Sequence, residues 1–175
     1  MGFRVYFLLV LASAIIFTVD SAEGKTWTVR QDGSGDTTEI ENAINSASDG
    51  DSIDIGPGHF EVQYYIGTED LTIYGSGVDS TFINCNYDTS DYVFRIGADN
   101  VVLSDFSVND ETFCRSFQVY NNAQNVEINN VKIYQVYSQS LYFDWNTKVT
   151  LKNSIVGVLG EPIAGLGYYC MVISV

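Results

Sequence analysis

The sequence predicts an all-β fold, a parallel β-helix of about five coils that follows a short capping helix. Three observations predict it: a segment that recurs along the chain, an apolar alternation inside each copy, and a Gly, Asp or Asn at one fixed place in every copy. Solenoids are the folds that show such a repeat, because each coil buries its apolar face only against its neighbours.

The four copies begin at residues 70, 100, 125 and 148, so successive starts lie 30, 25 and 23 residues apart, and they read DLTIYGSGV, NVVLSDFSV, NVEINNVKI and KVTLKNSIV. Apolar residues at the second and fourth places predict a strand with one face in a core. The sixth place holds Gly75, Asp105, Asn130 and Asn153. Gly, Asp and Asn enter the left-handed backbone region most readily, so this place predicts a corner. We expect Asn130 and Asn153 to stack as a ladder, each bonding the backbone of the next coil.

Further strands are predicted between the copies. One precedes each later copy, at residues 92–96, 116–120 and 141–143, and an extra strand at residues 81–84 fits the longest interval. Three short parallel sheets follow from this arrangement. No stretch rich in Pro, Gly or Ser suggests a linker, so residues 25–175 are predicted to form one domain.

The stretch before the repeats predicts the cap, a helix over residues 38–47. Its apolar residues recur at the spacing of one helix face: Ile40, Ala43, Ile44 and Ala47. Thr38 and Glu41 match a capping box, in which the hydroxyl and the carboxylate each bond a backbone amide at the helix start. His59, in the sequence Gly-Pro-Gly-His-Phe, is interpreted as a turn residue.

This N-terminal stretch resembles the opening of right-handed parallel β-helix proteins of the pectin lyase-like superfamily. The resemblance rests on DGSG at residues 32–35, GDSIDI at 50–55 and PGHFE at 57–61, and GSGVDSTFI at 75–83 is similar to pectin methylesterases. It implies a right-handed coil. Those enzymes use two aspartates, glutamines and an arginine, but the downstream segments that hold them do not occur in this sequence. No catalytic residue is therefore carried over.

The first 22 residues have the pattern of a secretory signal peptide. Arg4 precedes an apolar run over residues 5–19, and the small residues Ser21 and Ala22 follow. The run is shorter than the ~20 residues that span a bilayer, so we predict cleavage, after Ser21 in preference to Ala22, and a secreted or cell-surface protein. An uncleaved membrane anchor is the alternative.

Charge and cysteine content narrow the class of partner. The net charge of −14 argues against nucleic acid and anionic membranes as partners, and leaves room for calcium without indicating a site. At most one disulfide can form among the three cysteines, Cys85, Cys114 and Cys170, and the sequence does not say which two would pair. With one His and no Cys-x-x-Cys, no zinc site is predicted.

One group of residues has the chemistry of a catalytic site. Arg115 lies near Asp110 and Glu111 in the sequence, and pectate lyases combine calcium-binding carboxylates with a basic residue that removes a proton beside the uronate carboxylate. A surface ion pair explains the same three residues more simply. Asp105 is explained by its corner.

A second group could bind sugars. Tyr134, Tyr137, Tyr142 and Trp145, with Asp144 among them, come from neighbouring coils and could present flat faces to a glycan. The alternative is that these rings pack in the core or stack along the outside of the coils.

The function predicted from the sequence is a non-catalytic β-helix module that binds a polysaccharide or another protein. Its C-terminal residues contain no helix or charged strand that would cover the last coil, so that open edge is an expected place for a partner. The alternative is a polysaccharide-active enzyme of the pectate lyase or pectin esterase type, or a truncated fragment of one. The oligomeric state stays open.

Overall fold

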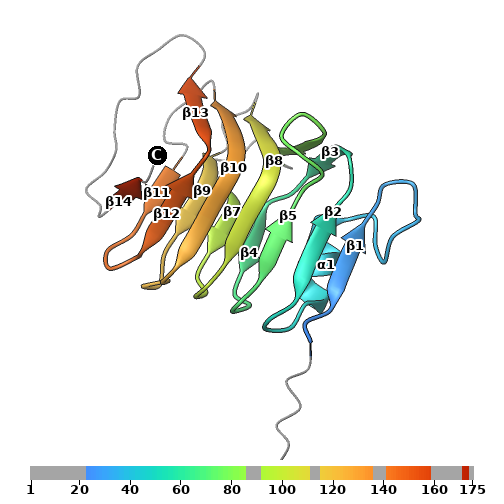
Figure 1. Cartoon of the computed structure of the whole chain (residues 1–175), viewed down its shortest axis with the longest axis horizontal. Coiled ribbons are helices and arrows are strands. Elements are labelled where there is room, and N and C mark those ends of the chain that lie inside the picture. Colours follow the sequence, from blue (N-terminus) through green and yellow to red (C-terminus); the bar gives the residue numbers. More distant parts are fainter. Residues whose placement is uncertain (1–22, 86–91, 111–114, 136–140, 159–170, 174–175) are drawn as a thin grey trace, which may run out of the picture.

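The computed structural model describes residues 23–85, 92–110, 115–135, 141–158 and 171–173 (Figure 1). They form a parallel β-helix of about five coils, which confirms the predicted fold class. Every strand pairing in it is parallel.

The elements fall into one helix and two sheets. The helix is α1 (Ile40–Ser46). Sheet A contains β1 (Thr26–Val29), β2 (Ser52–Ile55), β3 (Gly58–Glu61), β5 (Thr72–Tyr74), β6 (Thr81–Asn84), β8 (Val102–Asp110), β10 (Val126–Gln135), β12 (Val149–Lys152), β13 (Ile155–Val158) and β14 (Met171–Ile173). Sheet B contains β4 (Tyr64–Ile66), β7 (Tyr92–Ile96), β9 (Arg115–Val119) and β11 (Leu141–Phe143).

The strands predicted between the repeats are confirmed, since β7, β9 and β11 lie where they were expected and together build sheet B. The expected extra strand is β6. The prediction of three separate sheets is wrong in one respect. β8 and β10 continue through the corner without a break, and β10 pairs with both β12 and β13, so two of the three strand sets merge into sheet A (Figure 1).

The capping helix is shorter than predicted. It covers Ile40–Ser46, its N-cap is Glu39, and no side chain caps it, so the expected box of Thr38 and Glu41 does not form. The reason is the strand before it: Thr37 bridges to Val29 and exchanges backbone hydrogen bonds with β1 and the residue after it. This extended pairing delays the helix start. The buried residues of α1 are those of the predicted apolar face, Ile40, Ala43 and Ile44.

The predicted corners form at Asp105, Asn130 and Asn153, whose φ angles are 62°, 50° and 48°. Gly75, the fourth member, is not in the left-handed region; there the positive φ belongs to Gly77. Gly75 serves close packing instead, because a Cβ on it would lie 2.3 Å from the carbonyl oxygen of Asp105.

Ladders of polar side chains join the coils, with partners other than those predicted. Asn130 Nδ2 donates to Asp105 Oδ1 at 2.7 Å rather than to a backbone group, and Asn153 Nδ2 donates to Asn129 Oδ1. A longer ladder, not predicted from the sequence, lies at the first place of the repeat. Asp70, Asn100 and Asn125 all have positive φ, and two side-chain hydrogen bonds join them: Asn100 Nδ2 donates to Asp70 Oδ1 at 2.8 Å, and Asn125 Nδ2 donates to Asn100 Oδ1 at 3.0 Å.

The corner conformation makes Asn130 a testable position. Asn130→Ala should lower the free energy of unfolding by about 1–2 kcal/mol, because alanine is strained in the left-handed region and makes no bond to Asp105. Asn130→Gly loses the same bond but relieves the strain, so it should cost less. Urea unfolding followed by circular dichroism measures both variants, and equal losses would contradict the role of the backbone conformation.

The core lies between the two sheets and is built from the alternate inward residues of each strand. At its centre the rings of Phe94, Phe106 and Phe117, all fully buried, have centroids 6.2 to 6.4 Å apart. Cys85 is buried at the core edge and is disulfide-bonded, in line with the single disulfide allowed by the sequence. Cys114 and Cys170 lie outside the described residues.

Two further predictions concern segments at the N-terminal side. His59 is part of β3 rather than a turn, and its ring stacks on Phe82 of the neighbouring coil at 4.7 Å, because the strand continues through the position.

The predicted signal peptide lies outside the described residues. In the part of the chain that is described, no helix is both long and apolar enough to cross a membrane.

Candidate functional site

The outer face of sheet B collects the polar and aromatic residues that point away from the core. Pairing in the sheet places Tyr65, Arg95, Gln118 and Tyr142 side by side on successive strands. The residue that follows each of them along its strand is buried, since alternate residues of a strand face opposite sides. We call these four residues the outer row.

Contacts within this face hold Arg95 in place. Its Nε donates to Gln118 Oε1 at 3.1 Å, and its guanidinium carbon lies 5.3 Å from the centre of the Tyr120 ring. Tyr120 in turn lies 5.8 Å from the ring of Tyr65. A guanidinium oriented by a neutral amide and a ring keeps its full positive charge and its remaining donors.

Tyr65 rests directly on the backbone of its own and the next coil. A Cβ added at Gly67 would lie 2.8 Å from Tyr65 Cε1, and one at Gly97 would lie 2.9 Å from Cε2. Two glycines therefore make the room in which the ring lies. The ring is still 44% exposed, so it offers an aromatic surface that is firmly supported from beneath.

Most of the other cations among the described residues are paired with carboxylates, Lys148 being the exception. Four ion pairs link basic residues to carboxylates: Lys25–Asp36, Arg30–Asp54, Lys132–Asp79 and Lys152–Glu127. Among the described residues, no carboxylate forms an ion pair with Arg95 or Arg115, the two arginines of sheet B. Arg95 therefore brings to this face a positive charge that is in no ion pair with a described carboxylate.

The lyase-like group is only partly described. Arg115 opens β9, where its Nη1 lies 3.3 Å from the hydroxyl of Tyr92 and its guanidinium lies 5.3 Å from the same ring. Asp110 ends β8, and its side chain, like all of Glu111, lies outside the described residues. The predicted ion pair of these three residues therefore stays a prediction.

The predicted aromatic group divides between two sheets. Tyr142 belongs to the outer row, with its ring 6.4 Å from Tyr92. Asp144 and Trp145 follow β11 directly; the Trp145 backbone N–H donates to Asp144 Oδ1, and the Trp145 side chain is 78% exposed. Tyr134 instead lies in sheet A, paired with Asn109 and Gly157. Tyr137 lies outside the described residues.

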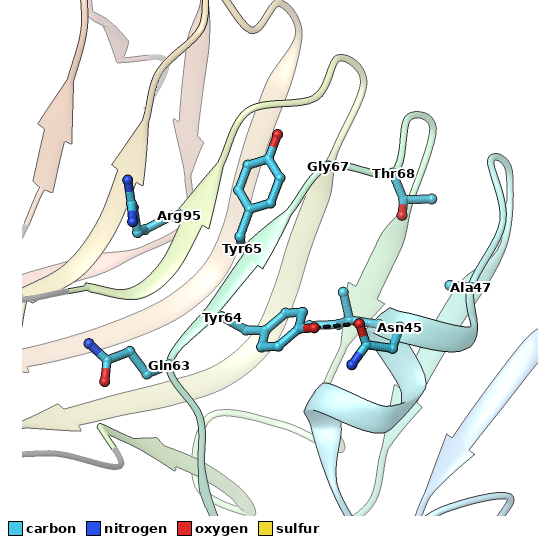
Figure 2. Close-up of a pocket in the computed structure, with 9 residues that line it drawn as sticks. Asn45, Ala47, Gln63, Tyr64, Tyr65, Gly67, Thr68 and Arg95 are labelled. Carbon is cyan, nitrogen blue, oxygen red and sulfur yellow. Dashed lines mark hydrogen bonds between the residues drawn. The ribbon is translucent and has the colours of Figure 1, made fainter.

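A pocket of about 560 Å³ lies at one end of the outer row, between sheet B and the end of α1 (Figure 2). On the helix side it is lined by Asn45 and Ala47. On the sheet side it is lined by Tyr65 of β4, Arg95 of β7, and two residues next to β4, Gln63 and Thr68. The hydroxyl of Tyr64 donates to Asn45 Oδ1 and ties the helix wall to the sheet.

Sequence reasoning missed the residues at this end of the face. Tyr65, Arg95, Gln118 and Tyr120 were not selected, and β4 was not predicted as a strand. Arg95 and Gln118 did carry a signal, because each is a polar residue at an outward place of a predicted strand. The register that sets them beside Tyr65 is a long-range property that no short stretch contains.

Calcium has no evident ligand cluster on this face. Within the described ranges, no group of three or more His, Cys, Asp or Glu residues is arranged to hold a metal ion.

Comparisons with known proteins give matches at the level of structure. No protein-family model and no curated protein sequence matches the chain. Two solved structures of pectin methylesterases, each in complex with a hexasaccharide, superpose with TM-scores of 0.64 and 0.60 at 16% and 15% identity. The matches cover 75% and 74% of this chain but 49% and 53% of those chains, so the protein spans about half the length of these neighbours. The chain thus shares the parallel β-helix fold of pectin methylesterases.

Proposed function

We propose that this protein is a secreted or cell-surface module that binds an extended, carboxylate-bearing polysaccharide along the outer row of sheet B and does not cleave it. The observation that carries the proposal is the placement of Arg95. It is oriented by Gln118 and Tyr120, has no ion pair with a described carboxylate, and lies in one row with exposed Tyr65 and half-buried Tyr142.

The chemistry of this row suits a glycan. Aromatic rings pack against the apolar faces of pyranose rings, amides bond hydroxyl groups, and a guanidinium binds a carboxylate through two parallel hydrogen bonds. Neighbouring strands are ~4.8 Å apart, which is similar to the length of one sugar residue in an extended chain. A polysaccharide lying across the strands would therefore meet one member of the row per sugar.

The negative net charge of the protein means that an anionic polysaccharide would bind only at a local positive site. The chain carries −14, so an anionic polymer is repelled by most of the protein surface. Binding at the outer row then depends strongly on its local cation. Trp145, which follows β11 at the other end of the same sheet, extends the surface available to a longer chain.

The proposal is tested by titrating the protein, without its predicted signal peptide, with polygalacturonate and with a neutral glycan, with and without calcium. Arg95→Gln should weaken binding to polygalacturonate at least tenfold. Lys148→Gln also removes one positive charge, from an exposed residue directly before β12 of sheet A. It should change the affinity for polygalacturonate less than twofold. Equal losses in the two variants, or no retention of any glycan, would overturn the proposal.

The lyase form of the enzyme alternative is tested in the same samples by the absorbance of unsaturated products. A lyase would form them, and Arg115→Ala would abolish them, which would make Asp110 and Glu111 the next residues to replace. Binding without unsaturated product argues against a lyase and is the result expected of the binding module. Absence of both would favour a protein partner, for which the last coil is the expected place.

A further inference from the structure

The outer row is closed at one end by the capping helix. Along the chain, β4, β7, β9 and β11 each lie between strands of sheet A, and α1 lies in the same position between β1 and β2. The first coil therefore has a helix where later coils have a strand of sheet B. As a result β4 is the edge strand of sheet B, and the pocket fills the space between this edge and the helix (Figure 2).

The pocket has the features of a site for one sugar residue. Tyr65 forms an aromatic wall that Gly67 and Gly97 support from beneath. Arg95 supplies a positive charge, and Asn45, Gln63 and Thr68 supply amide and hydroxyl groups. In a parallel sheet, the backbone N–H and C=O groups of alternate residues on an edge strand point away from the sheet. Those of Tyr65 are on the side of β4 opposite its pairing with β7, because the amide of Gly97 donates to the carbonyl of Ile66, the next residue of the strand.

We infer that this pocket binds the terminal residue of the glycan, a uronate whose carboxylate contacts Arg95, so that the protein recognises chain ends rather than chain interiors. This inference rests on the proposed function. A chain that follows the outer row towards α1 meets the helix wall of Asn45 and Ala47 after Tyr65. The bond between Tyr64 and Asn45 holds that wall against the sheet, so the chain has no continuation in that direction.

The first test uses size-defined galacturonate oligomers with altered ends. One sample has its reducing end converted to an alditol, and another has an unsaturated residue at its non-reducing end. One of these two changes should weaken binding at least tenfold, measured by isothermal titration calorimetry, while the other has little effect. A long polymer should compete according to its number of ends and not its mass.

The second test fills the pocket. Asn45→Trp places a large ring at the pocket wall, whereas Ser46→Trp places the same ring on the next exposed residue of α1, which does not line the pocket. Asn45→Trp should weaken binding of the unmodified oligomer at least tenfold and remove the difference between modified and unmodified ends, and Ser46→Trp should do neither. Thermal unfolding checks that both variants are folded.

The outcomes separate the two proposals. If oligomers bind and both end modifications leave the affinity within twofold, end recognition is wrong and binding along the row stands. If oligomers bind and Asn45→Trp acts no more strongly than Ser46→Trp, the pocket is not the site of the chain end. If no glycan binds, the proposed function itself fails, and the inference fails with it.

Discussion

Phe117→Ala is expected to lower the free energy of unfolding by about 3–5 kcal/mol, because the ring is fully buried and its removal leaves a cavity between the two sheets. Phe117 on β9 contacts Phe94 on β7 in a stacked arrangement, with an interplanar angle of 10°, and it also contacts Phe106 on β8. The three rings join successive coils and both sheets. Their surroundings are set by paired backbones, which limits how far the cavity can close.

Phe82→Ala is the matched control. Phe82 lies on the outward side of β6, is only partly buried, and stacks on His59 at the surface. Its replacement should cost about 1 kcal/mol. Urea unfolding of both variants, followed by far-ultraviolet circular dichroism, gives the comparison. Losses of similar size would show that the stack of three rings is not the centre of the core.

Asp51→Asn is expected to cost about 2–4 kcal/mol. Asp51 is 7% exposed and accepts three hydrogen bonds: Oδ1 from the backbone N–H of Lys25 at 2.7 Å, and Oδ2 from Trp27 Nε1 at 3.0 Å and from the backbone N–H of Ser48 at 2.9 Å. Asparagine has one acceptor oxygen, so in either orientation its NH₂ group faces at least one of these partly buried donors. The variant should therefore loosen the contact between β1 and the turn after α1.

The contribution of the Asp51 carboxylate to the free energy of unfolding should depend on pH. The hydrogen bond from the backbone of Ser48, followed by those from Trp27 and Lys25, holds the pKa of Asp51 below its usual 3.8, against the opposing effect of burial. A lowered folded pKa means that the contribution is complete above about pH 4 and is lost as the pH falls through the folded value. The difference in stability between the original protein and Asp51→Asn should therefore shrink in acid.

Asp79→Asn serves as the control for this substitution. Its side chain is 83% exposed and pairs with Lys132 on the surface, so the same chemical change should cost less than about 1 kcal/mol. Thermal unfolding of the three proteins between pH 3 and 7 tests both statements. A cost for Asp51→Asn as small as that for Asp79→Asn, or one that is constant down to pH 3, would contradict the role assigned to Asp51.

The repeat and the corners were predictable because they depend on local rules. An alternation of apolar residues defines a strand, and Asp105, Asn130 and Asn153 belong to the residue types that enter the left-handed region with least strain. The same local rule failed at Gly75, where glycine is needed because a side chain would clash with Asp105 of the next coil, and not because of a left-handed φ. The prediction of the helix start was wrong for a similar reason, since the pairing of Thr37 with β1 outweighs the capping box of Thr38 and Glu41.

By itself, the sequence determined that the chain is a parallel β-helix with an N-terminal helix, because each coil repeats the same short-range pattern. Only the tertiary structure decided which side chains share a surface. It separated Tyr134 from Tyr142 and Trp145, and set Arg95 between Tyr65 and Gln118. These neighbours lie about one coil apart in the chain, and a shift of register by one residue would turn each side chain to the opposite face of its sheet. The face that carries the proposed function is therefore a consequence of register, which the packing of the core sets.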